Sequence, residues 1–255
     1  MAADGSPQLI LAGFGSSAPL QITLEAQQMA NHVGHILGLG LPERLRAAFA
    51  RQGIGVTPLD DLLDAGTTAE GYAAVGQAVL ARAQQDPPAM FVSQGSPLFV
   101  NAITRYLATE AARLELQVRI FPGVSPVDVI VGEIGLDVGR SGLQTITGRG
   151  LVARPLALNP RMPLLLLELA GMAAQGGSAE AYGPLVQALL ESYPPHQAVT
   201  LINLPGDGGI SRATVTLAEF GELLPNIDLS SSLFIDIRRK ATTDAPSPGV
   251  TNVTD

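Results

Sequence analysis

The sequence predicts an α/β protein whose first half contains a parallel sheet. Over residues 8–123, short and almost continuous aliphatic runs alternate with longer amphipathic segments. Strands that are apolar on both faces are typical of parallel sheets covered by helices on both sides. Two of the aliphatic runs end in glycine-containing corners, at residues 13–19 and 93–97. In open parallel sheets, ligands bind at the edge where such corners lie.

The expected elements of the first half follow in regular order. Thr23 is the expected N-cap of the first helix, Pro42 stands in the first turn of the second, and Gly53 ends that helix. The expected strands are 8–15, 33–40, 89–95 and 117–123, and the expected helices are 23–32, 42–52, 68–85 and 101–115.

The pattern changes after Pro122 and Gly123. Residues 126–136 are consistent with a helix, and 180–193 with a longer one. Short strands are expected at 142–148, 162–171, 196–204, 211–220 and 230–237. We therefore predict two domains, residues 1–123 with a parallel sheet and 124–237 with a mixed or largely antiparallel one. Residues 238–255 are polar, proline-containing and aperiodic, which predicts a disordered tail.

Composition excludes several classes of partner. The net charge is −8 and the arginines are scattered, whereas phosphate-backbone binding needs a concentrated basic face, so no nucleic acid is expected. The longest apolar stretch, 162–174, is short for a membrane span and contains Glu168. The N-terminus lacks the basic start of a secretion signal, so the expected location is cytoplasmic. The absence of cysteine removes disulfides and thiolate metal sites.

Few side chains are arranged for metal binding or acid–base chemistry. His32 and His35 are three residues apart, but no further ligand completes a set, so no metal is predicted. Asp60, Asp61 and Asp64 are more typical of a solvated face than of catalytic carboxylates.

The two glycine corners match no familiar nucleotide or hydrolase motif. The first has Gly-x-Gly without a clear third glycine, and a Gly-Lys-Ser/Thr loop is absent. Gly-x-Ser-x-Gly is absent too, and no histidine accompanies Ser93 or Ser96. Taken singly, each corner is more typical of an ordinary strand-to-helix turn than of a ligand loop.

Taken together, three stretches resemble one family. "LILAGFGSSAPLQITLEA", "FVSQGSPLFV" and "FPGVSPVDVIVGEIGLD" occur in the order and spacing of the tetrapyrrole methylase superfamily of S-adenosylmethionine (SAM)-dependent methyltransferases. The resemblance covers residues 8 to 237. It implies two α/β domains, SAM bound in the cleft between them, and a homodimer.

Within that superfamily, the sequence is most similar to borosin-type peptide backbone N-methyltransferases. "PGVSPVDVIVGEIGLDVGRSGLQTITG", "LNPRMPLLLLELAG" and "YPPHQAVTLINL" resemble that branch. The porphyrin and precorrin enzymes would carry Gly-Asp-Pro where this chain has Ser96 in the middle position. The branch also places several tyrosines and an arginine around its target amide. Only Tyr72 matches here, because Leu62 and Thr68 stand where another tyrosine and the arginine are expected.

The borosin resemblance implies α-N-methylation of a ribosomal (RiPP) precursor peptide. Fused members of that branch carry their substrate in a long C-terminal extension, whereas this chain has a short tail, so the split type is implied, with a separate precursor peptide as partner. The open alternatives are a SAM-dependent C-methyltransferase of a tetrapyrrole or other small molecule, and a degenerate, non-catalytic binding protein.

The resemblance also assigns residues to the site. Tyr72 is the candidate base that removes the amide proton; an equally acceptable interpretation makes it a tyrosine that caps the core. The residues expected to bind SAM are Phe14, Gly15, Gly95, Ser96, Pro97, Val100, Ser125, Leu167 and Ala170.

Overall fold

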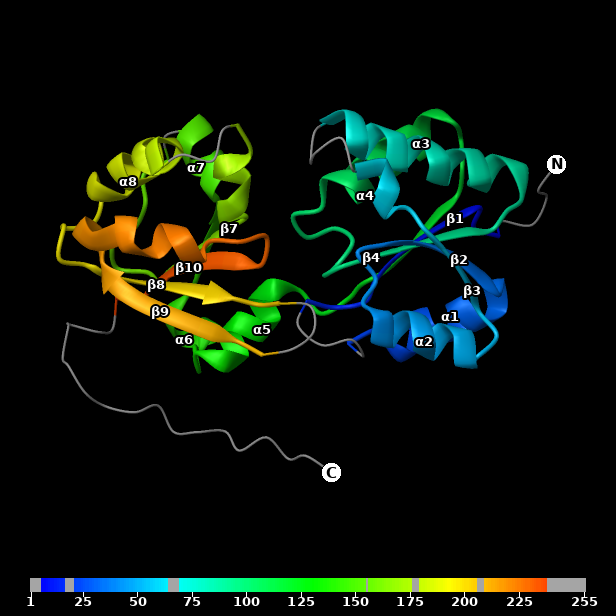
Figure 1. The fold of residues 1–255 in the computed structure, drawn as a ribbon, viewed down its shortest axis with the longest axis horizontal. Helices are drawn as coiled ribbons and strands as arrows, with labels where there is room; N and C mark the ends of the chain where they lie inside the picture. Colours follow the sequence, from blue (N-terminus) through cyan, green and yellow to red (C-terminus); the bar gives the residue numbers. More distant parts are fainter. Residues whose placement is uncertain are drawn as a thin grey trace, which may run out of the picture. The chain divides into compact units, whose positions relative to one another are not determined.

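The computed structural model describes residues 6–16, 21–63, 69–154, 156–175, 179–205 and 209–237. Contacts divide the chain into two compact units, Met1–Val138 with Ile202–Ser211, and Gly139–Leu201 with Arg212–Asp255. Each unit combines one five-stranded sheet with helices (Figure 1), which confirms the predicted α/β class. Residues 124–138 belong to the first unit, whereas the sequence analysis places them in the second domain. The predicted tail lies outside the described residues.

The first unit is built on a parallel sheet with the strand order β3-β2-β4-β1-β5. The strands are β1 (Leu9–Gly13), β2 (His35–Leu39), β3 (Gly55–Pro58), β4 (Ala89–Ser93) and β5 (Val118–Phe121). The register aligns their carboxyl ends, since Ser93 lies opposite Gly13 on one side and Leu39 on the other. The loops that follow β1 and β4 therefore start at the same edge of the sheet.

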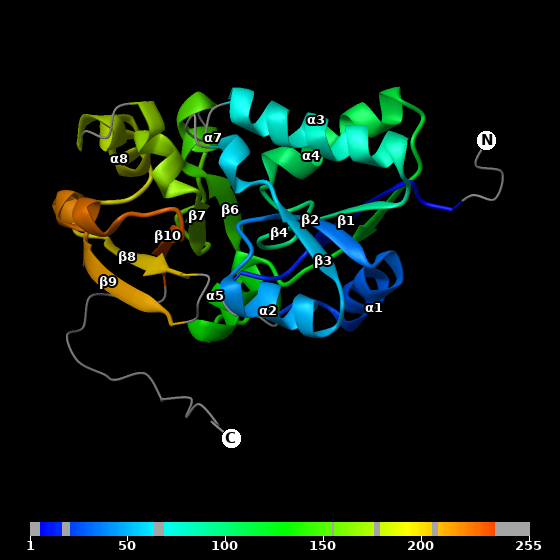
Figure 2. The ribbon, with the colours of Figure 1, turned by 45° about the vertical axis from the view of Figure 1, so that its right-hand side comes forward.

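Helices cover both faces of this sheet (Figures 1 and 2). They are α1 (Leu24–Val33), α2 (Glu43–Arg51), α3 (Ala69–Gln85) and α4 (Ala102–Arg113). A 3₁₀ turn, η1 (Asp60–Leu63), precedes α3, and α5 (Pro126–Glu133) follows β5. Alternate residues of β1 belong to different core clusters, because strand side chains alternate between faces. Leu11 packs with residues of α3 and α4, and Ile10 packs with residues of α1 and α2.

Local signals explain where these helices begin and end. Thr23 is the N-cap of α1 as predicted, and its hydroxyl accepts a hydrogen bond from the Ala26 N–H (3.3 Å). Pro42 is the N-cap residue of α2 and not part of its first turn, so the helix begins one residue later than expected, at Glu43. Gly53 has a φ of 75°, which suits the turn that ends α2.

The second unit contains a mixed sheet with the order β6-β7-β10-β8-β9. The strands are β6 (Gln144–Thr147), β7 (Leu164–Leu167), β8 (Ala198–Asn203), β9 (Ser211–Thr216) and β10 (Ser231–Ile235). β6 and β7 are parallel, whereas β7 and β10 are antiparallel, as a mixed sheet requires. The accompanying helices are α6 (Val138–Ser141), α7 (Gly148–Ala153), α8 (Gly183–Leu190), and the 3₁₀ segments η2 (Leu169–Gln175), η3 (Ala179–Tyr182) and η4 (Leu217–Asn226).

Candidate functional site

Three glycines bring the loops after β1, β4 and β5 into direct backbone contact. A Cβ added to Gly13, at the end of β1, would collide with the carbonyl oxygen of Gly95. A Cβ added to Gly123, which follows β5, would collide with the same oxygen and lie 2.9 Å from the Gly13 carbonyl oxygen. Only glycine allows this close approach. We call Gly13, Gly95 and Gly123 the glycine junction.

The two corners singled out in the sequence are also hydrogen-bonded to each other. Gly15 and Gly95 form an isolated antiparallel bridge, in which the Gly95 N–H donates to the Gly15 carbonyl (2.9 Å) and the Gly15 N–H donates to the Gly95 carbonyl (3.3 Å). Both residues have left-handed backbones, with φ of 94° and 75°. Positive φ favours glycine at both positions. Close packing adds to this preference at Gly15, where an added Cβ would collide with the Gln21 side chain.

Ser16 extends this arrangement to the loop that enters α5. Its hydroxyl is almost fully buried and donates to the Val124 carbonyl (3.0 Å). Its N–H donates to Gln21 Oε1 (2.9 Å), and Gln94 Nε2 donates to its carbonyl (3.3 Å). The hydrogen bond from the Ser16 hydroxyl connects the loop after β1 to residue 124 within the first unit. Sequence reasoning missed Ser16, Gln21 and Gln94, although two of them lie within the quoted corners.

Ser96 and Pro97 complete the turn after β4. The Ser96 side chain is half-buried, and its hydroxyl makes no hydrogen bond with any described residue. The Ser96 carbonyl accepts from the Phe99 N–H (3.1 Å), and the Pro97 carbonyl accepts from the buried Thr104 hydroxyl. The turn is therefore fixed through its backbone while the Ser96 hydroxyl remains available.

Val100 has a strained backbone, with a φ of 49°. A β-branched residue in the left-handed region is a genuine outlier and costs about 1–3 kcal/mol. The next residue holds the chain in place. Asn101 is the N-cap of α4 and accepts from the Thr104 N–H (3.1 Å), while its Nδ2 donates to the Ser93 hydroxyl (3.1 Å). Strain of this kind clusters at binding loops, and a cofactor role for Val100 stays a prediction.

Two other predicted cofactor residues have their side chains engaged in packing or capping. The Phe14 side chain is one of the largest fully buried groups and belongs to the core on the α1 and α2 side of the sheet. Only its backbone remains for a ligand. The Ser125 hydroxyl donates to Asp128 Oδ2 (2.6 Å), and the two residues form a capping box at the start of α5.

The last two predicted cofactor residues lie in the second unit. Leu167 is buried at the end of β7, and Ala170 lies at the start of η2. Between them, Glu168 has a φ of 55°, which marks a sharp turn after a buried strand. A cofactor role for Leu167 and Ala170 stays a prediction.

Tyr72 lies in the first turn of α3 and packs against the core on the α3 and α4 side of the sheet. α3 follows β3 and η1, so it begins near the carboxyl edge of the sheet, where the glycine junction lies. The half-buried ring of Tyr72 fits a tyrosine that caps the core. The position of Tyr72 at this edge of the sheet fits the candidate catalytic base. Leu62 is partly exposed (38%), and Thr68 lies outside the described residues.

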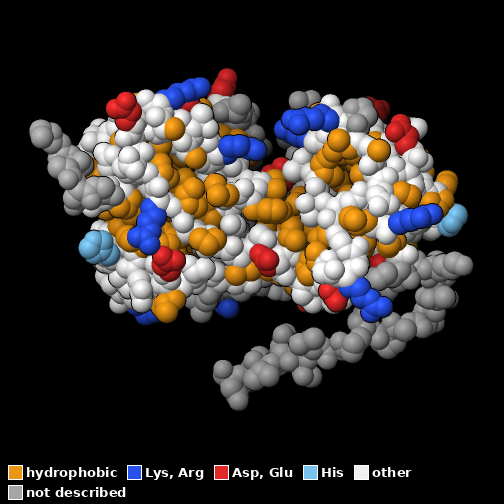
Figure 3. Space-filling view, turned by 180° about the vertical axis from the view of Figure 1, so that it is seen from behind, with side chains coloured by type: hydrophobic (Ala, Val, Ile, Leu, Met, Phe, Trp, Pro, Cys, Tyr) orange, Lys and Arg blue, Asp and Glu red, His pale blue; other side chains and the backbone are white. Residues whose placement is uncertain are grey.

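Charged groups form no concentrated site in the described part of the chain. No group of three or more His, Cys, Asp or Glu side chains among those residues could hold a metal ion. His35 Nε2 lies 2.9 Å from the Thr57 hydroxyl. On the face seen in Figure 3, Lys and Arg side chains are scattered rather than gathered in a stripe. No described helix is long and apolar enough to cross a membrane.

The chain is similar to known proteins both in its sequence pattern and in its fold. A family model described as Tetrapyrrole (Corrin/Porphyrin) Methylases matches residues 8–220. No curated protein sequence matches the chain.

Solved structures share the fold at low sequence identity. The uroporphyrin-III-C-methyltransferase of Thermus thermophilus is 20% identical, with a TM-score of 0.66 over 89% of this chain and 90% of that one. The same enzyme complexed with S-adenyl homocysteine is 17% identical, with a TM-score of 0.65 over 90% and 98%. A cobalamin biosynthetic enzyme, cobalt precorrin-4 methyltransferase, is 13% identical, with a TM-score of 0.62 over 92% and 97%.

Proposed function

The chain belongs to the tetrapyrrole (corrin/porphyrin) methylase family, and on that premise we propose that it is a SAM-dependent methyltransferase whose acceptor is a tetrapyrrole or another small molecule. The observation that carries this proposal is the glycine junction at the carboxyl edge of the first sheet, in a chain that matches the family over residues 8–220. Support for the cofactor comes from the structural relative that was solved with S-adenyl homocysteine, the form that SAM takes after giving up its methyl group.

The residues at the junction fit a nucleoside-containing cofactor. The backbone of the turn at residues 94–97 can lie close to a ligand because Gly95 has no side chain, although the N–H and C=O groups of Gly95 themselves pair with Gly15. The Ser96 hydroxyl, unpaired among the described residues, adds a donor and an acceptor at the same place. We assign cofactor binding to this turn and to the backbone of Phe14 and Gly15.

SAM, when bound, would supply a methyl group on a sulfonium: the carbon–sulfur electron pair would return to sulfur as an electron pair of the acceptor, a π pair where the acceptor is a carbon atom, forms the new bond, and a proton of the acceptor would pass to solvent. The task of the chain is to hold the two reactants in line and to exclude water. The Asn101 side chain, through its hydrogen bonds with Ser93 and Thr104, fixes the end of this turn, and positioning is the contribution that such a displacement requires.

Calorimetry with SAM and a methyl-transfer assay test the proposal. We expect the protein to bind SAM and to transfer labelled methyl from it to uroporphyrinogen III, an acceptor suggested by the name of the first structural relative. Gly95→Val places a side chain in the turn and is expected to abolish SAM binding. Gly132→Ala, in a helix where an added Cβ meets nothing within 4 Å, is the matched control. A folded wild-type protein that binds no SAM would contradict the proposal.

Peptide backbone N-methylation is a second candidate, favoured by Ser96 and Tyr72. Ser96 occupies the position where the sequence resemblance expects Asp in porphyrin and precorrin enzymes, and Tyr72 begins a helix at the sheet edge of the junction. A backbone amide is a poor nucleophile because its lone pair is delocalised, so this reaction needs a base such as the Tyr72 phenolate. The proposal includes a homodimer and a separate precursor peptide.

Mass spectrometry of co-expressed precursor peptides tests this second candidate. Methyl mass increments that disappear with Tyr72→Phe support it, and their absence on every candidate peptide argues against it. Light scattering measures the proposed homodimer directly. If SAM binds but neither acceptor class is methylated, the third interpretation, a non-catalytic binding protein, is favoured instead.

A further inference from the structure

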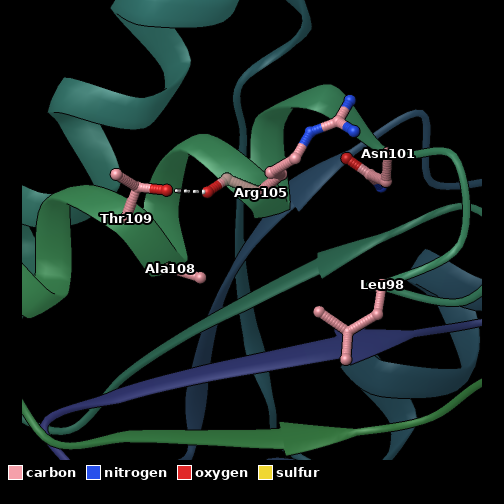
Figure 4. A pocket seen from close by; sticks show the side chains of 5 residues that line it. All are labelled: Leu98, Asn101, Arg105, Ala108 and Thr109. Atoms are coloured by element: carbon pink, nitrogen blue, oxygen red, sulfur yellow. Dashed lines mark hydrogen bonds between the residues drawn. The ribbon is translucent and has the colours of Figure 1, made fainter.

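A groove runs along the outer face of α4, beginning next to the turn after β4. Its volume is about 320 Å³. Its lining residues, labelled in Figure 4, are Leu98, Asn101, Arg105, Ala108 and Thr109. The last four share one face of the helix because they are spaced at i, i+4, i+7 and i+8. Leu98 belongs to the same turn as Gly95 and Ser96, so the groove begins where the candidate cofactor loop ends.

The groove combines apolar walls with one cation. Leu98 is 67% exposed, and Ala108 adds a second apolar surface. Among the described residues that line the groove, Arg105 is the only charged one.

The other polar side chains of the groove are already engaged. The Thr109 hydroxyl donates to the Arg105 carbonyl (3.0 Å), as the dashed line in Figure 4 shows. The Asn101 amide caps α4 and donates to the Ser93 hydroxyl. The Arg105 guanidinium, by contrast, forms no ion pair or hydrogen bond with the described residues. It is therefore the group in the groove that is available to a ligand.

We propose that this groove binds a carboxylate carried on an apolar body, with Arg105 contacting the carboxylate and Leu98 and Ala108 contacting the body. A guanidinium pairs with a carboxylate through two parallel hydrogen bonds. The protein has a net charge of −8, so a local cation is needed to hold an anion at its surface. Resting on the proposed function, the inference identifies the ligand as a carboxylate arm of the methyl acceptor. The groove lies at the small end of the range of ligand pockets, which suits an arm rather than a whole macrocycle.

Nuclear magnetic resonance with heptanoate tests the groove without any methyl transfer. Heptanoate carries a carboxylate on an apolar chain, and heptanol has the same chain without the charge. We expect heptanoate to shift the Arg105 Nε resonance and the amides of residues 98–109, and heptanol to cause no such shifts. Arg105→Gln is expected to weaken heptanoate binding about 10-fold or more, and Arg105→Lys is expected to restore part of it.

Arg44 supplies the matched control. It is an exposed arginine on α2, and α2 packs on the opposite face of the sheet from α4. Arg44→Gln should leave heptanoate binding unchanged. Equal binding by Arg105→Gln and wild type, or equal shifts with heptanol, would overturn the inference. Resonance shifts of the groove residues that depend on protein concentration and not on heptanoate would also overturn the inference. Such shifts would identify the groove as a contact between copies of the chain.

Turnover separates this inference from the proposed function. With uroporphyrinogen III as acceptor, Arg105→Gln should raise KM about 10-fold while kcat and SAM affinity stay near those of wild type. An unchanged KM would overturn the assignment of the arm to this groove. If heptanoate binds as expected but no tetrapyrrole is methylated, the carboxylate site stands and the proposed acceptor class fails.

Discussion

Gly15 and Gly95 hydrogen-bond to each other through both of their backbone groups, although one follows β1 and the other follows β4. The bridge is antiparallel, whereas β1 and β4 pair in parallel, so it is a separate contact formed beyond the end of the sheet. The bridge also joins the loops after β1 and β4 into one continuous surface. The close contacts of the glycine junction add the loop after β5 to that surface. A binding site formed in this way consists largely of backbone, and its properties depend on which positions can tolerate a Cβ.

Gly13→Ala is predicted to destabilise the first unit and to abolish SAM binding. The added Cβ would collide with the Gly95 carbonyl oxygen, a backbone atom that cannot move without disturbing the loop after β4. We expect a loss of about 1–3 kcal/mol in the free energy of unfolding, in the range of overpacking in a tight site. Urea denaturation and calorimetry with SAM measure the two effects.

Gly132→Ala is the control for that loss. Gly132 lies within α5, where an added Cβ meets nothing within 4 Å. Alanine there should raise helix propensity and stabilise the protein by about 0.5–1 kcal/mol. If Gly13→Ala were as stable as wild type, the close approach of the backbones at the junction would be refuted.

Val100→Asn is predicted to maintain or raise stability, despite the loss of a half-buried apolar side chain. Val100 has a φ of 49°, and asparagine tolerates the left-handed region far better than a β-branched residue does. Relief of strain of about 1–2 kcal/mol should offset the lost packing. We expect SAM affinity to fall if the strained backbone positions the turn, and thermal unfolding and calorimetry report on the two properties separately.

Val129→Asn provides the comparison for Val100→Asn. Val129 is also half-buried but lies in the regular helix α5, so its replacement removes packing without relieving strain. It should destabilise the protein by about 1 kcal/mol. Equal destabilisation by the two substitutions would show that Val100 is not strained.

The first half of the fold was predictable because its strands are nearly continuous apolar runs between helices with clear end signals. β3 was missed because it lies at the edge of the sheet, and its sequence contains glycine, threonine and proline with no buried residue among them. In the second unit, α8 is shorter than the expected helix at 180–193. The residues before Gly183 form a 3₁₀ segment, and Pro184 lies in the first turn of α8.

The site was predictable in part, because glycine at the end of a buried strand indicates a positive φ or a close approach of backbone. The hydrogen-bonding roles of Ser16 and Gln21 were not predictable, since they depend on a loop far along the chain and on local loop geometry. The side chains of Phe14 and Ser125 serve core packing and helix capping, and a cofactor role for these two residues stays a prediction. Sequence resemblance identifies positions in a candidate site, but it does not distinguish a residue that contacts the ligand from one that supports the fold.

Tyr193→Phe is predicted to reduce the loss of stability at alkaline pH. The Tyr193 hydroxyl is buried and has no hydrogen-bond partner among the described residues. Burial raises the pKa of Tyr193, and the nearby Gln144 amide offsets part of the rise. That amide makes its own hydrogen bonds with Asn159 and Met162, so we regard the tyrosine hydroxyl as unpaired.

The sign of the pH effect follows from the raised pKa. Above about pH 10 the unfolded chain releases the tyrosine proton while the folded chain retains it, so the stability of wild type falls as pH rises through that value. Tyr193→Phe has no proton to release, so its unfolding free energy should fall less between about pH 9 and 11. At about pH 8 it should equal or exceed wild type by up to about 1 kcal/mol. A larger alkaline loss in Tyr193→Phe than in wild type would contradict this account.

Ser96→Ala is predicted to weaken SAM binding without affecting the fold. The Ser96 hydroxyl makes no hydrogen bond with the described residues, so its removal should change the free energy of unfolding by less than about 0.5 kcal/mol. Loss of one hydrogen bond to a bound cofactor should raise the Kd for SAM about 2–10-fold.

Ser93→Ala is the contrasting change, since the Ser93 hydroxyl is buried and accepts from Asn101, and its loss should lower stability by about 1–2 kcal/mol. Calorimetry together with urea denaturation separates the two variants. A Ser96→Ala protein with wild-type SAM affinity would leave only the backbone of this turn as the cofactor contact.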